Sequence, residues 1–169
     1  MDLFEAIAKR KSCRSLIKTE IPMGDLEKIV DAGRLAPSGM NRQPFEFIII
    51  TDPETISKLS IVQGFIRDAS AIIAIVADEK QSKYWLEDVS ASAENMLLAI
   101  TALGYESCWV EGTLLRKEEE AKAILNVPAD KRLVIFLPIG KSLVAGSQAI
   151  KKSAGEMTYY EKYGQRQRP

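Results

Sequence analysis

The feature that most constrains the fold is a short apolar run near the middle of the chain. Residues 70–77 contain Ile72-Ile73-Ala74-Ile75-Val76, a largely β-branched segment without a polar side chain that would face water. The surrounding near-apolar stretch, residues 69–77, is roughly half as long as a membrane-spanning helix requires. The run therefore predicts a strand that is buried on both faces, inside a sheet that lies between helices.

The rest of the chain alternates irregularly between patterns typical of strands and of helices. Apolar and β-branched residues predict further strands over residues 45–51, 105–111 and 133–139. Helical periodicity predicts helices that begin after Asp2, run over 22–35, begin at residue 53, and run over 85–103 and 116–125. Residues 142–152 are expected to form a loop, and the polar, aromatic tail over 159–169 is not expected to join the core. Without strict strand–helix alternation or a linker, the sequence predicts an α+β fold in which residues 1–169 form a single domain.

The composition excludes several kinds of chemistry. The chain has no histidine, which excludes Ser-His-Asp and Cys-His catalysis, H-E-x-x-H zinc sites and imidazole general bases. Its two cysteines, Cys13 and Cys108, form no C-x-x-C pair, so neither a zinc site nor dithiol chemistry is expected. The two are able in principle to pair with each other, but two isolated thiols fit a reducing compartment better.

The charge balance bears on the partners of the protein. Lys plus Arg total 23 and Asp plus Glu total 23, so the formal net charge is zero. This balance argues against a general nucleic-acid or anionic-membrane binder. The first residues are acidic and amphipathic, unlike a signal peptide. We therefore expect a cytoplasmic protein without a nucleic-acid or membrane partner.

A cationic segment follows the first predicted helix. Lys9, Arg10, Lys11 and Arg14 stand close together without an acid among them. In extended chain, Arg10, Ser12 and Arg14 project from one face, because side chains on a strand alternate. Two guanidinium groups beside a hydroxyl can donate bidentate hydrogen bonds to a phosphate or carboxylate. The alternative is a solvated helix end, where cations favour the C-terminal dipole.

A loop between two prolines separates the second predicted helix from the first strand. Its sequence is Pro37-Ser38-Gly39-Met40-Asn41-Arg42-Gln43-Pro44. The segment carries many hydrogen-bond donors and acceptors on a rigid support, as recognition of a heteroaromatic ring requires. An ordinary helix-to-strand turn is the alternative, but such a turn needs neither of the amides Asn41 and Gln43. These amides favour a binding role.

The predicted strand over residues 105–111 ends in an acid and a glycine. Gly112 after Glu111 would let backbone N–H groups approach a ligand closely. Taken alone, the pair is more typical of a strand that leaves its sheet through a turn. Cys108 and Trp109 are interpreted as core residues.

Taken together, these segments resemble the signature blocks of the FMN-dependent nitroreductase family in its compact form. The blocks are residues 10–14, 36–47 and 104–112, which occur in the order of the family and at compatible spacing. Residues 91–103 and 156–164 are also similar, so the resemblance covers nearly the whole chain.

The resemblance implies an α+β fold with a central mixed sheet flanked by helices, in an intertwined homodimer that holds FMN at the subunit interface. It assigns cofactor binding to four groups of residues. These are Arg10, Lys11, Ser12 and Arg14 at the phosphate and pyrimidine side; Pro37, Ser38, Gly39 and Asn41 from the partner subunit; Glu111 and Gly112 near N5; and the C-terminal pair Lys151 and Lys152.

The resemblance also implies an activity. The protein would use NADH or NADPH to reduce a small-molecule acceptor, a nitroaromatic or quinone, by ping-pong hydride transfer. Hydride transfer through a flavin needs no protein nucleophile, base or metal, so no catalytic side chain and no metal site are expected. The lack of histidine is compatible with this chemistry.

Other functions remain open on the same scaffold. A flavin-dependent dehalogenase or ring dehydrogenase would keep the FMN and change the acceptor, and a nonenzymatic protein would only bind flavin. The chain departs from the family in places: residues 61–68 form a short segment where longer members carry a helical insertion, and Phe45 stands where many relatives have Trp. Without a G-x-G-x-x-G motif, neither FMN nor NAD is held in the Rossmann manner.

Overall fold

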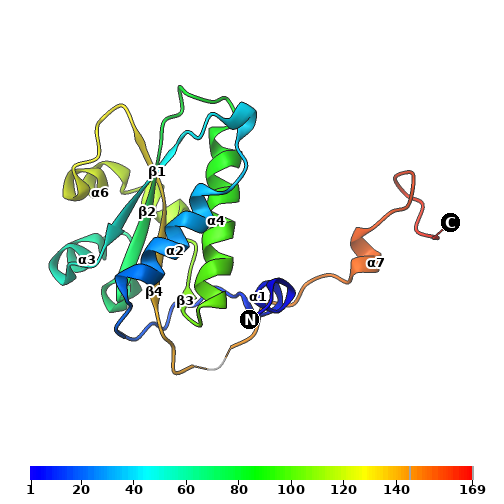
Figure 1. Ribbon diagram of the computed structural model, residues 1–169, viewed down its shortest axis with the longest axis horizontal. Coiled ribbons are helices and arrows are strands. Elements are labelled where there is room, and N and C mark those ends of the chain that lie inside the picture. Colours follow the sequence, from blue (N-terminus) through cyan, green and yellow to red (C-terminus); the bar gives the residue numbers. More distant parts are fainter. Residues whose placement is uncertain (145, 169) are drawn as a thin grey trace.

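A four-stranded antiparallel sheet forms the centre of the molecule (Figure 1). The computed structural model of the chain describes residues 1–144 and 146–168. The strands are β1 (Phe45–Ile50), β2 (Ala71–Ala77), β3 (Glu106–Ser107) and β4 (Arg132–Gly140), in the order β1-β2-β4-β3. Within the described residues, parallel pairing is confined to a bridge between Ser12 and Ser107. The predicted α+β class with a sheet flanked by helices is confirmed, but the four strands pair antiparallel and the sheet is not mixed as expected, because Ser12 of the parallel bridge lies outside the named strands.

The apolar run lies where the sequence predicts. All seven residues of β2 are buried, and β2 pairs with β1 on one side and β4 on the other. Its side chains alternate between two cores: Ile72 and Ala74 point into one, and Ile73 and Ile75 into the other. A strand with both faces covered needs no polar alternation, which is why this run is apolar throughout.

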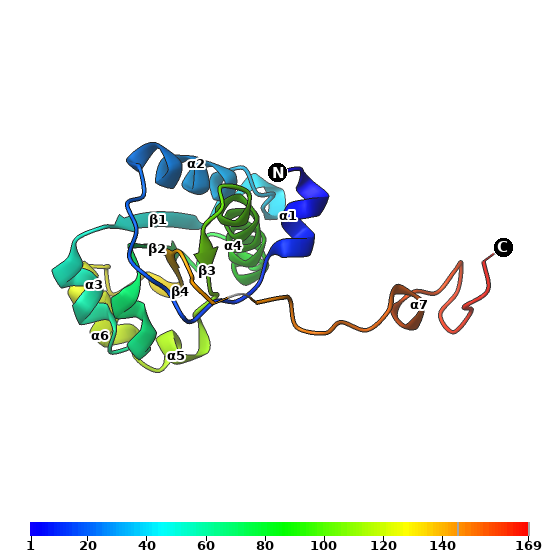
Figure 2. The ribbon, with the colours of Figure 1, turned by 90° about the horizontal axis from the view of Figure 1, so that it is seen from below.

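Helices cover both faces of the sheet (Figure 2). One face packs against α3 (Pro53–Leu59), η2 (Gly64–Asp68), α5 (Gly112–Leu115) and α6 (Glu118–Leu125). The other face packs against α2 (Met23–Arg34) and α4 (Trp85–Ala102), and α1 (Leu3–Lys9) lies beside α4. The sheet therefore lies between two helical layers, as predicted.

The helix boundaries follow the predicted signals closely. The carboxylate of Asp2 accepts a hydrogen bond from the Glu5 N–H at 2.9 Å, and Pro22 precedes the first turn of α2. Gly104 follows α4 with φ of 80°, the left-handed conformation in which glycine ends a helix without strain.

The predicted strand over residues 105–111 is much shorter than expected. Only Glu106 and Ser107 pair regularly with β4, and Val110 rejoins it by a single bridge to Phe136. Cys108 and Trp109 lie between them, and the register of β3 places Cys108 opposite Pro138 of β4, which has no N–H to donate to the ladder. The proline therefore interrupts the pairing.

The C-terminal part leaves the body of the molecule. After β4, the chain extends away from the sheet as coil. It then forms the single helical turn α7 (Ala154–Met157) and ends in an exposed tail (Figures 1 and 2). A hydrogen bond of 2.6 Å from Gln148 Nε2 to the Ile7 carbonyl fixes the start of this segment beside α1. Of the expected loop and tail, Ala145 and Pro169 lie outside the described residues. Across the described ranges, no helix combines the length and apolar character needed to cross a membrane.

Candidate functional site

A cavity of about 430 Å³ brings together residues from both ends of the chain. We call it the cationic cavity. Its lining consists of Arg10, Lys11, Ser12, Arg14, Ser147, Gln148, Ala149 and Lys151. All the cofactor-binding residues predicted in the N-terminal segment therefore line the same cavity as Lys151, one of the two predicted C-terminal lysines. Lys152 is exposed and is not part of this lining.

The N-terminal wall of the cavity is held against the sheet. Helix α1 ends with the Arg10 N–H donating to the Ala6 carbonyl at 2.9 Å. The Cys13 N–H then donates to the Ser107 carbonyl at 2.8 Å, so that the segment runs beside β3 in extended conformation. Cys13 is buried below the segment, whereas Ser12 and Arg14 are exposed on the cavity side. The alternation predicted for Arg10, Ser12 and Arg14 is thus present.

The cations of the cavity differ in their partners. Arg10 Nε lies 3.6 Å from the Glu94 carboxylate, and Lys11 forms an ion pair with Glu106. Over the described residues, Arg14 has no acidic partner within ion-pair distance. Arg14 therefore offers the guanidinium that is most available to an added anion.

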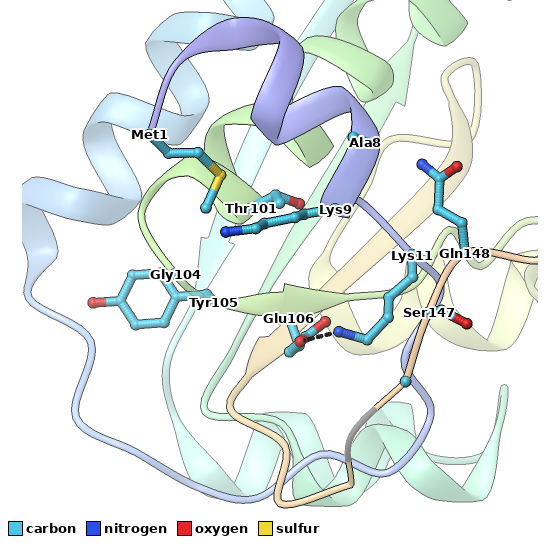
Figure 3. Close-up of a pocket in the computed structure, with 11 residues that line it drawn as sticks. Met1, Ala8, Lys9, Lys11, Thr101, Gly104, Tyr105, Glu106, Ser147 and Gln148 are labelled. Carbon is cyan, nitrogen blue, oxygen red and sulfur yellow. Dashed lines mark hydrogen bonds and ion pairs between the residues drawn. The ribbon is translucent and has the colours of Figure 1, made fainter.

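A second cavity of about 460 Å³ adjoins the first (Figure 3). It lies between α1 and the end of α4, and it shares Lys11, Ser147 and Gln148 with the cationic cavity. Figure 3 shows the Lys11 ammonium turned toward Glu106. The ion pair therefore fixes Lys11 at the boundary between the two cavities.

The two cysteines are buried free thiols. Burial raises the pKa of Cys108, and nearby Arg14 and Ser12 oppose this effect without cancelling it. A raised pKa keeps the thiol protonated near neutral pH, so Cys108 is no nucleophile. Within the described ranges, no group of three or more Cys, Asp or Glu side chains is placed to hold a metal ion.

The loop over residues 37–44 lies elsewhere. It contains the short turn η1 (Gly39–Asn41) and sits at the N-terminal end of α4, far along this helix from α1 (Figure 1). Pro37, Ser38, Gly39 and Asn41 therefore do not line the cationic cavity of the same chain. A small cavity of about 260 Å³, lined in part by Gly39, Met40 and Tyr84, adjoins the loop instead.

The side chains of the loop have different tasks. Ser38 Oγ accepts a hydrogen bond from the Gln43 N–H at 3.0 Å, and Gln43 Nε2 donates to the Asn41 carbonyl at 3.0 Å. Gln43, predicted to take part in binding, thus closes the loop on itself. Sequence reasoning missed Asp88, whose carboxylate accepts a hydrogen bond from the Gly39 N–H at 2.8 Å. The sequence feature that could have indicated this role is the position of Asp88, an acidic residue directly before Val89 in the long helix, where both side chains are buried.

Glu111 and Gly112 lie at the start of α5. The indole N–H of Trp109 donates to the Glu111 carboxylate at 2.8 Å, so Trp109 does more than fill the core. Glu111 itself has φ of −131° and ψ of −67°, outside the regular helical and extended regions. Neither Glu111 nor Gly112 lines the cationic cavity.

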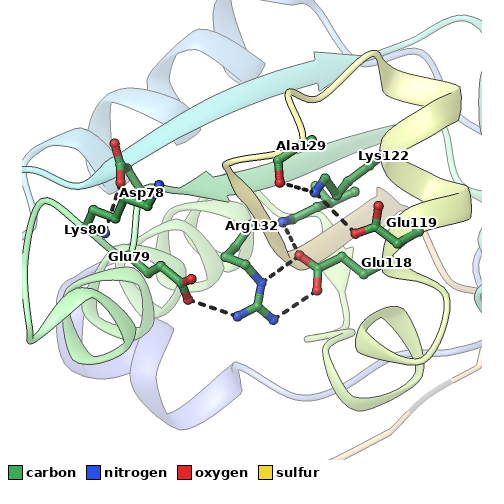
Figure 4. A network of polar contacts seen from close by, with 9 residues as sticks. Asp78, Glu79, Lys80, Glu118, Glu119, Lys122, Ala129 and Arg132 are labelled. Carbon is green, nitrogen blue, oxygen red and sulfur yellow. Dashed lines mark hydrogen bonds and ion pairs between the residues drawn. The ribbon is translucent and has the colours of Figure 1, made fainter.

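A separate cluster of charged residues joins α6 to the sheet (Figure 4). Arg132 donates two hydrogen bonds of 2.9 Å to the Glu118 carboxylate, which also accepts one from the Leu133 N–H. Burial alone would raise the pKa of Glu118, but the hydrogen bonds from Arg132 and the Leu133 backbone outweigh it and lower the pKa. Because these groups satisfy one another, the cluster is structural.

Comparisons with known proteins show the family of the chain. The Nitroreductase family model matches residues 7–62 and 60–141. A candidate NADH dehydrogenase/NAD(P)H nitroreductase of Archaeoglobus fulgidus is 38% identical over 145 residues, which are 80% of this chain and 81% of that protein. An iodotyrosine deiodinase of Thermotoga neapolitana is 26% identical over 166 residues, 82% of this chain and 87% of that protein. The structure of an FMN-dependent nitroreductase of Clostridium difficile superimposes with a TM-score of 0.83 at 26% identity, covering 95% of this chain and 99% of that one.

Proposed function

Because the chain belongs to the nitroreductase family, we propose that it is an NAD(P)H-dependent flavin oxidoreductase that binds FMN and reduces a nitroaromatic or quinone-type acceptor. The observation that carries this proposal is the cationic cavity. This cavity gathers Arg10, Ser12, Arg14 and Lys151 from opposite ends of the chain. Among the described residues, no acidic side chain forms an ion pair with Arg14.

The donors of this cavity fit the phosphate of FMN. Guanidinium groups donate to phosphate oxygens in pairs, and each charged hydrogen bond contributes about 1.5–3 kcal/mol. Several such bonds hold a cofactor without a covalent link. Because both ends of the chain supply them, residues 1–169 act as one FMN-binding domain.

The remaining predicted residues have defined tasks under this proposal. Arg14 places positive charge beside the N1–C2 edge of the ring, where it stabilises negative charge. The backbone at Glu111 and Gly112 would supply an N–H to the N5 side of bound FMN, and Lys11 and Lys152 would add positive potential at its phosphate. When bound, FMN supplies the redox chemistry, a two-electron exchange first with NADH or NADPH and then with the acceptor in a ping-pong sequence.

The position of the loop over residues 37–44 supports a homodimer. This loop is held through Asp88 at the N-terminal end of α4, whereas Arg10 of the cationic cavity lies beside Glu94 in the middle of that helix, and the loop does not line the cavity of its own chain. Phe4 of α1 is 80% exposed and Leu143 is 85% exposed, which leaves apolar surface for a second copy to cover. We therefore place FMN at the subunit interface, with Pro37, Ser38, Gly39 and Asn41 contributed by the partner subunit. Two free buried thiols fit a cytoplasmic location.

Spectra and kinetics test the proposal. The purified protein is expected to show the absorbance of bound oxidised flavin, and NADH or NADPH is expected to bleach it under argon. With menadione or a nitrofuran as acceptor, double-reciprocal plots should be parallel. Intersecting lines would contradict a shared site, and flavin that neither nicotinamide reduces would identify a nonenzymatic flavin-binding protein.

Reductive dehalogenation is the second candidate function. It is favoured by the relative in Thermotoga neapolitana that is named as an iodotyrosine deiodinase. An anaerobic assay of the reduced protein against a panel of halophenols separates the two functions. Halide release that is faster than reduction of any nitroaromatic or quinone would favour the dehalogenase.

A further inference from the structure

The loop over residues 37–44 has a backbone that needs support. Met40, Asn41 and Gln43 have φ values of 52°, 55° and 49°, in the left-handed region that non-glycine residues rarely adopt. Three such residues in one short loop persist only where surrounding contacts fix the conformation.

The internal hydrogen bonds of the loop supply part of this support. The Asn41 N–H donates to the Ser38 carbonyl at 2.9 Å, and the Gln43 N–H donates to Ser38 Oγ at 3.0 Å. These bonds define the shape of the turn, but they do not fix the loop relative to the rest of the molecule.

The external support comes from the start of α4 and from the segment before it, where Arg42 Nη1 donates to the Gln81 carbonyl at 2.9 Å and the Asp78 N–H donates to the Pro44 carbonyl at 2.8 Å. Asp88 Oδ1 accepts the Gly39 N–H at 2.8 Å, and Asp88 Oδ2 accepts the hydroxyl proton of Ser82 at 3.1 Å. Ser82 Oγ in turn accepts the Tyr84 N–H at 3.1 Å. Asp88 is 5% exposed and Ser82 is 3% exposed, so water does not compete well for these bonds.

The surroundings of Asp88 make it a rigid acceptor. It lies in the first turn of an 18-residue helix, where the helix dipole favours a carboxylate, and its neighbour Val89 is fully buried in the core. The ring of Tyr84 packs against Gly39 so closely that a Cβ on Gly39 would lie 2.6 Å from Tyr84 Cδ2. Asp88 therefore holds the Gly39 end of the loop on α4, while Arg42 and Pro44 attach its other end to the segment before this helix.

We propose that Asp88, oriented by Ser82, is a positioning residue that sets the loop over residues 37–44 in its cofactor-binding shape. Asp88 acts through the Gly39 N–H and has no contact with the cofactor itself. The inference rests on the proposed function, since the loop must bind FMN for its position to matter.

The test measures the Kd for FMN and the urea unfolding of the apoprotein for matched variants. Asp88→Ala is expected to raise the Kd about tenfold, because one charged hydrogen bond to the loop is lost. Asp88→Asn keeps an acceptor for the Gly39 N–H and is expected to stay within about threefold of the wild type. Glu87→Ala removes a carboxylate from the same turn at an exposed position and is expected to leave the Kd unchanged.

A double-mutant cycle separates positioning from general destabilisation. Asn41→Gly preserves the left-handed backbone and removes the amide. If Asp88 acts through the loop, Asp88→Ala and Asn41→Gly together raise the Kd less than the product of their single effects. Arg14 belongs to the cationic cavity and not to the loop. In the double variant of Asp88→Ala and Arg14→Ala, the increase in the Kd should therefore equal the product of the two single increases.

Several results would overturn the inference. These are an Asp88→Ala protein that binds FMN as the wild type does, an Asp88→Asn protein as weak as Asp88→Ala, or a multiplicative cycle with Asn41→Gly. If Asp88→Ala fails to fold, Ser82→Ala is measured instead, with an expected rise in the Kd of about threefold. A Ser82→Ala protein that binds FMN with wild-type affinity would also contradict the inference. A wild-type protein that binds no FMN would instead contradict the proposed function.

Discussion

Arg14 offers the sharpest test at the scale of single residues. It lines the cationic cavity and, over the described residues, has no acidic partner, whereas Lys9 lies outside this cavity and is paired with Glu5 at 2.6 Å. We expect Arg14→Ala to raise the Kd for FMN by about tenfold to a hundredfold, because a charged hydrogen bond contributes about 1.5–3 kcal/mol. Lys9→Ala is the control and should change the Kd little. Equal effects in a titration by flavin fluorescence quenching would contradict the assignment.

The two C-terminal lysines are distinguished by the same measurement. The sequence offers Lys151 and Lys152 equally, but only Lys151 lines the cationic cavity. We expect Lys151→Ala to raise the Kd at least about fivefold more than Lys152→Ala, because a charge-assisted contact to the phosphate is lost only in Lys151→Ala. A larger effect of Lys152→Ala would mean that the tail is turned differently when FMN is bound.

Residue types predicted the cationic segment better than they predicted the loop. The alternation of Arg10, Ser12 and Arg14 depends only on extended backbone, so the sequence predicts it directly. The tasks of Gln43 and Asp88 depend on which atoms the fold brings together across 49 positions, as in the bond between Gly39 and Asp88. Local sequence patterns do not predict a contact between residues so far apart in the chain.

At the scale of elements, the packing of α2 on α4 depends on Gly33. A Cβ at this position would lie 2.8 Å from Met96 Cγ and 3.0 Å from Ser92 Oγ, whereas nothing lies within 4 Å of a Cβ at Gly24 in the same helix. We expect Gly33→Ala to lower the free energy of unfolding by about 1–3 kcal/mol through overpacking. Gly24→Ala should leave it unchanged or raise it by up to about 1 kcal/mol, because alanine favours helix. Urea denaturation of the two variants checks both values.

The hydrogen bonds between Glu118 and Arg132 make the attachment of α6 depend on pH. The pKa of Glu118 is lowered in the folded protein from its ordinary value of 4.5, so its stabilisation is complete above that value. It is lost as the pH falls through the lowered folded-state pKa. We expect Glu118→Gln to cost about 1–3 kcal/mol of unfolding free energy at pH 7 and progressively less below pH 4.5.

The neighbouring residue provides the control for this pH dependence. Glu119 is 81% exposed at its side chain and, among the described residues, forms a single ion pair, with Lys122 at 3.3 Å. Glu119→Gln should therefore change stability by less than about 0.5 kcal/mol at either pH. A difference between wild type and Glu118→Gln that stays constant from pH 7 to pH 3 would contradict the account.

Elements were predictable where one pattern decides them. The apolar run of β2, the caps at Asp2 and Asp52 and the stop at Gly104 each act within a few residues. The short β3 was not predictable from its own sequence, because its length is set by Pro138 on the partner strand. Pairing depends on both strands, and the register between them is a property of the fold.

At the scale of the whole molecule, the account requires two chains. In one chain the loop over residues 37–44 does not line the cationic cavity, and the C-terminal segment contributes residues 147–149 and Lys151 to that cavity before it extends from the body (Figures 1 and 2). The family resemblance predicts a site shared by two subunits, and we propose that the loop over residues 37–44 completes the cationic cavity of a second copy, since it does not line the cavity of its own chain. Loss of FMN should therefore weaken the assembly, since each flavin would contact both copies.

Native mass spectrometry of the purified protein, with FMN added in excess, tests this account most directly. The account predicts one species of two 18.8 kDa chains that together carry two FMN molecules. A single chain that remains free of flavin at FMN concentrations saturating for related enzymes would contradict it.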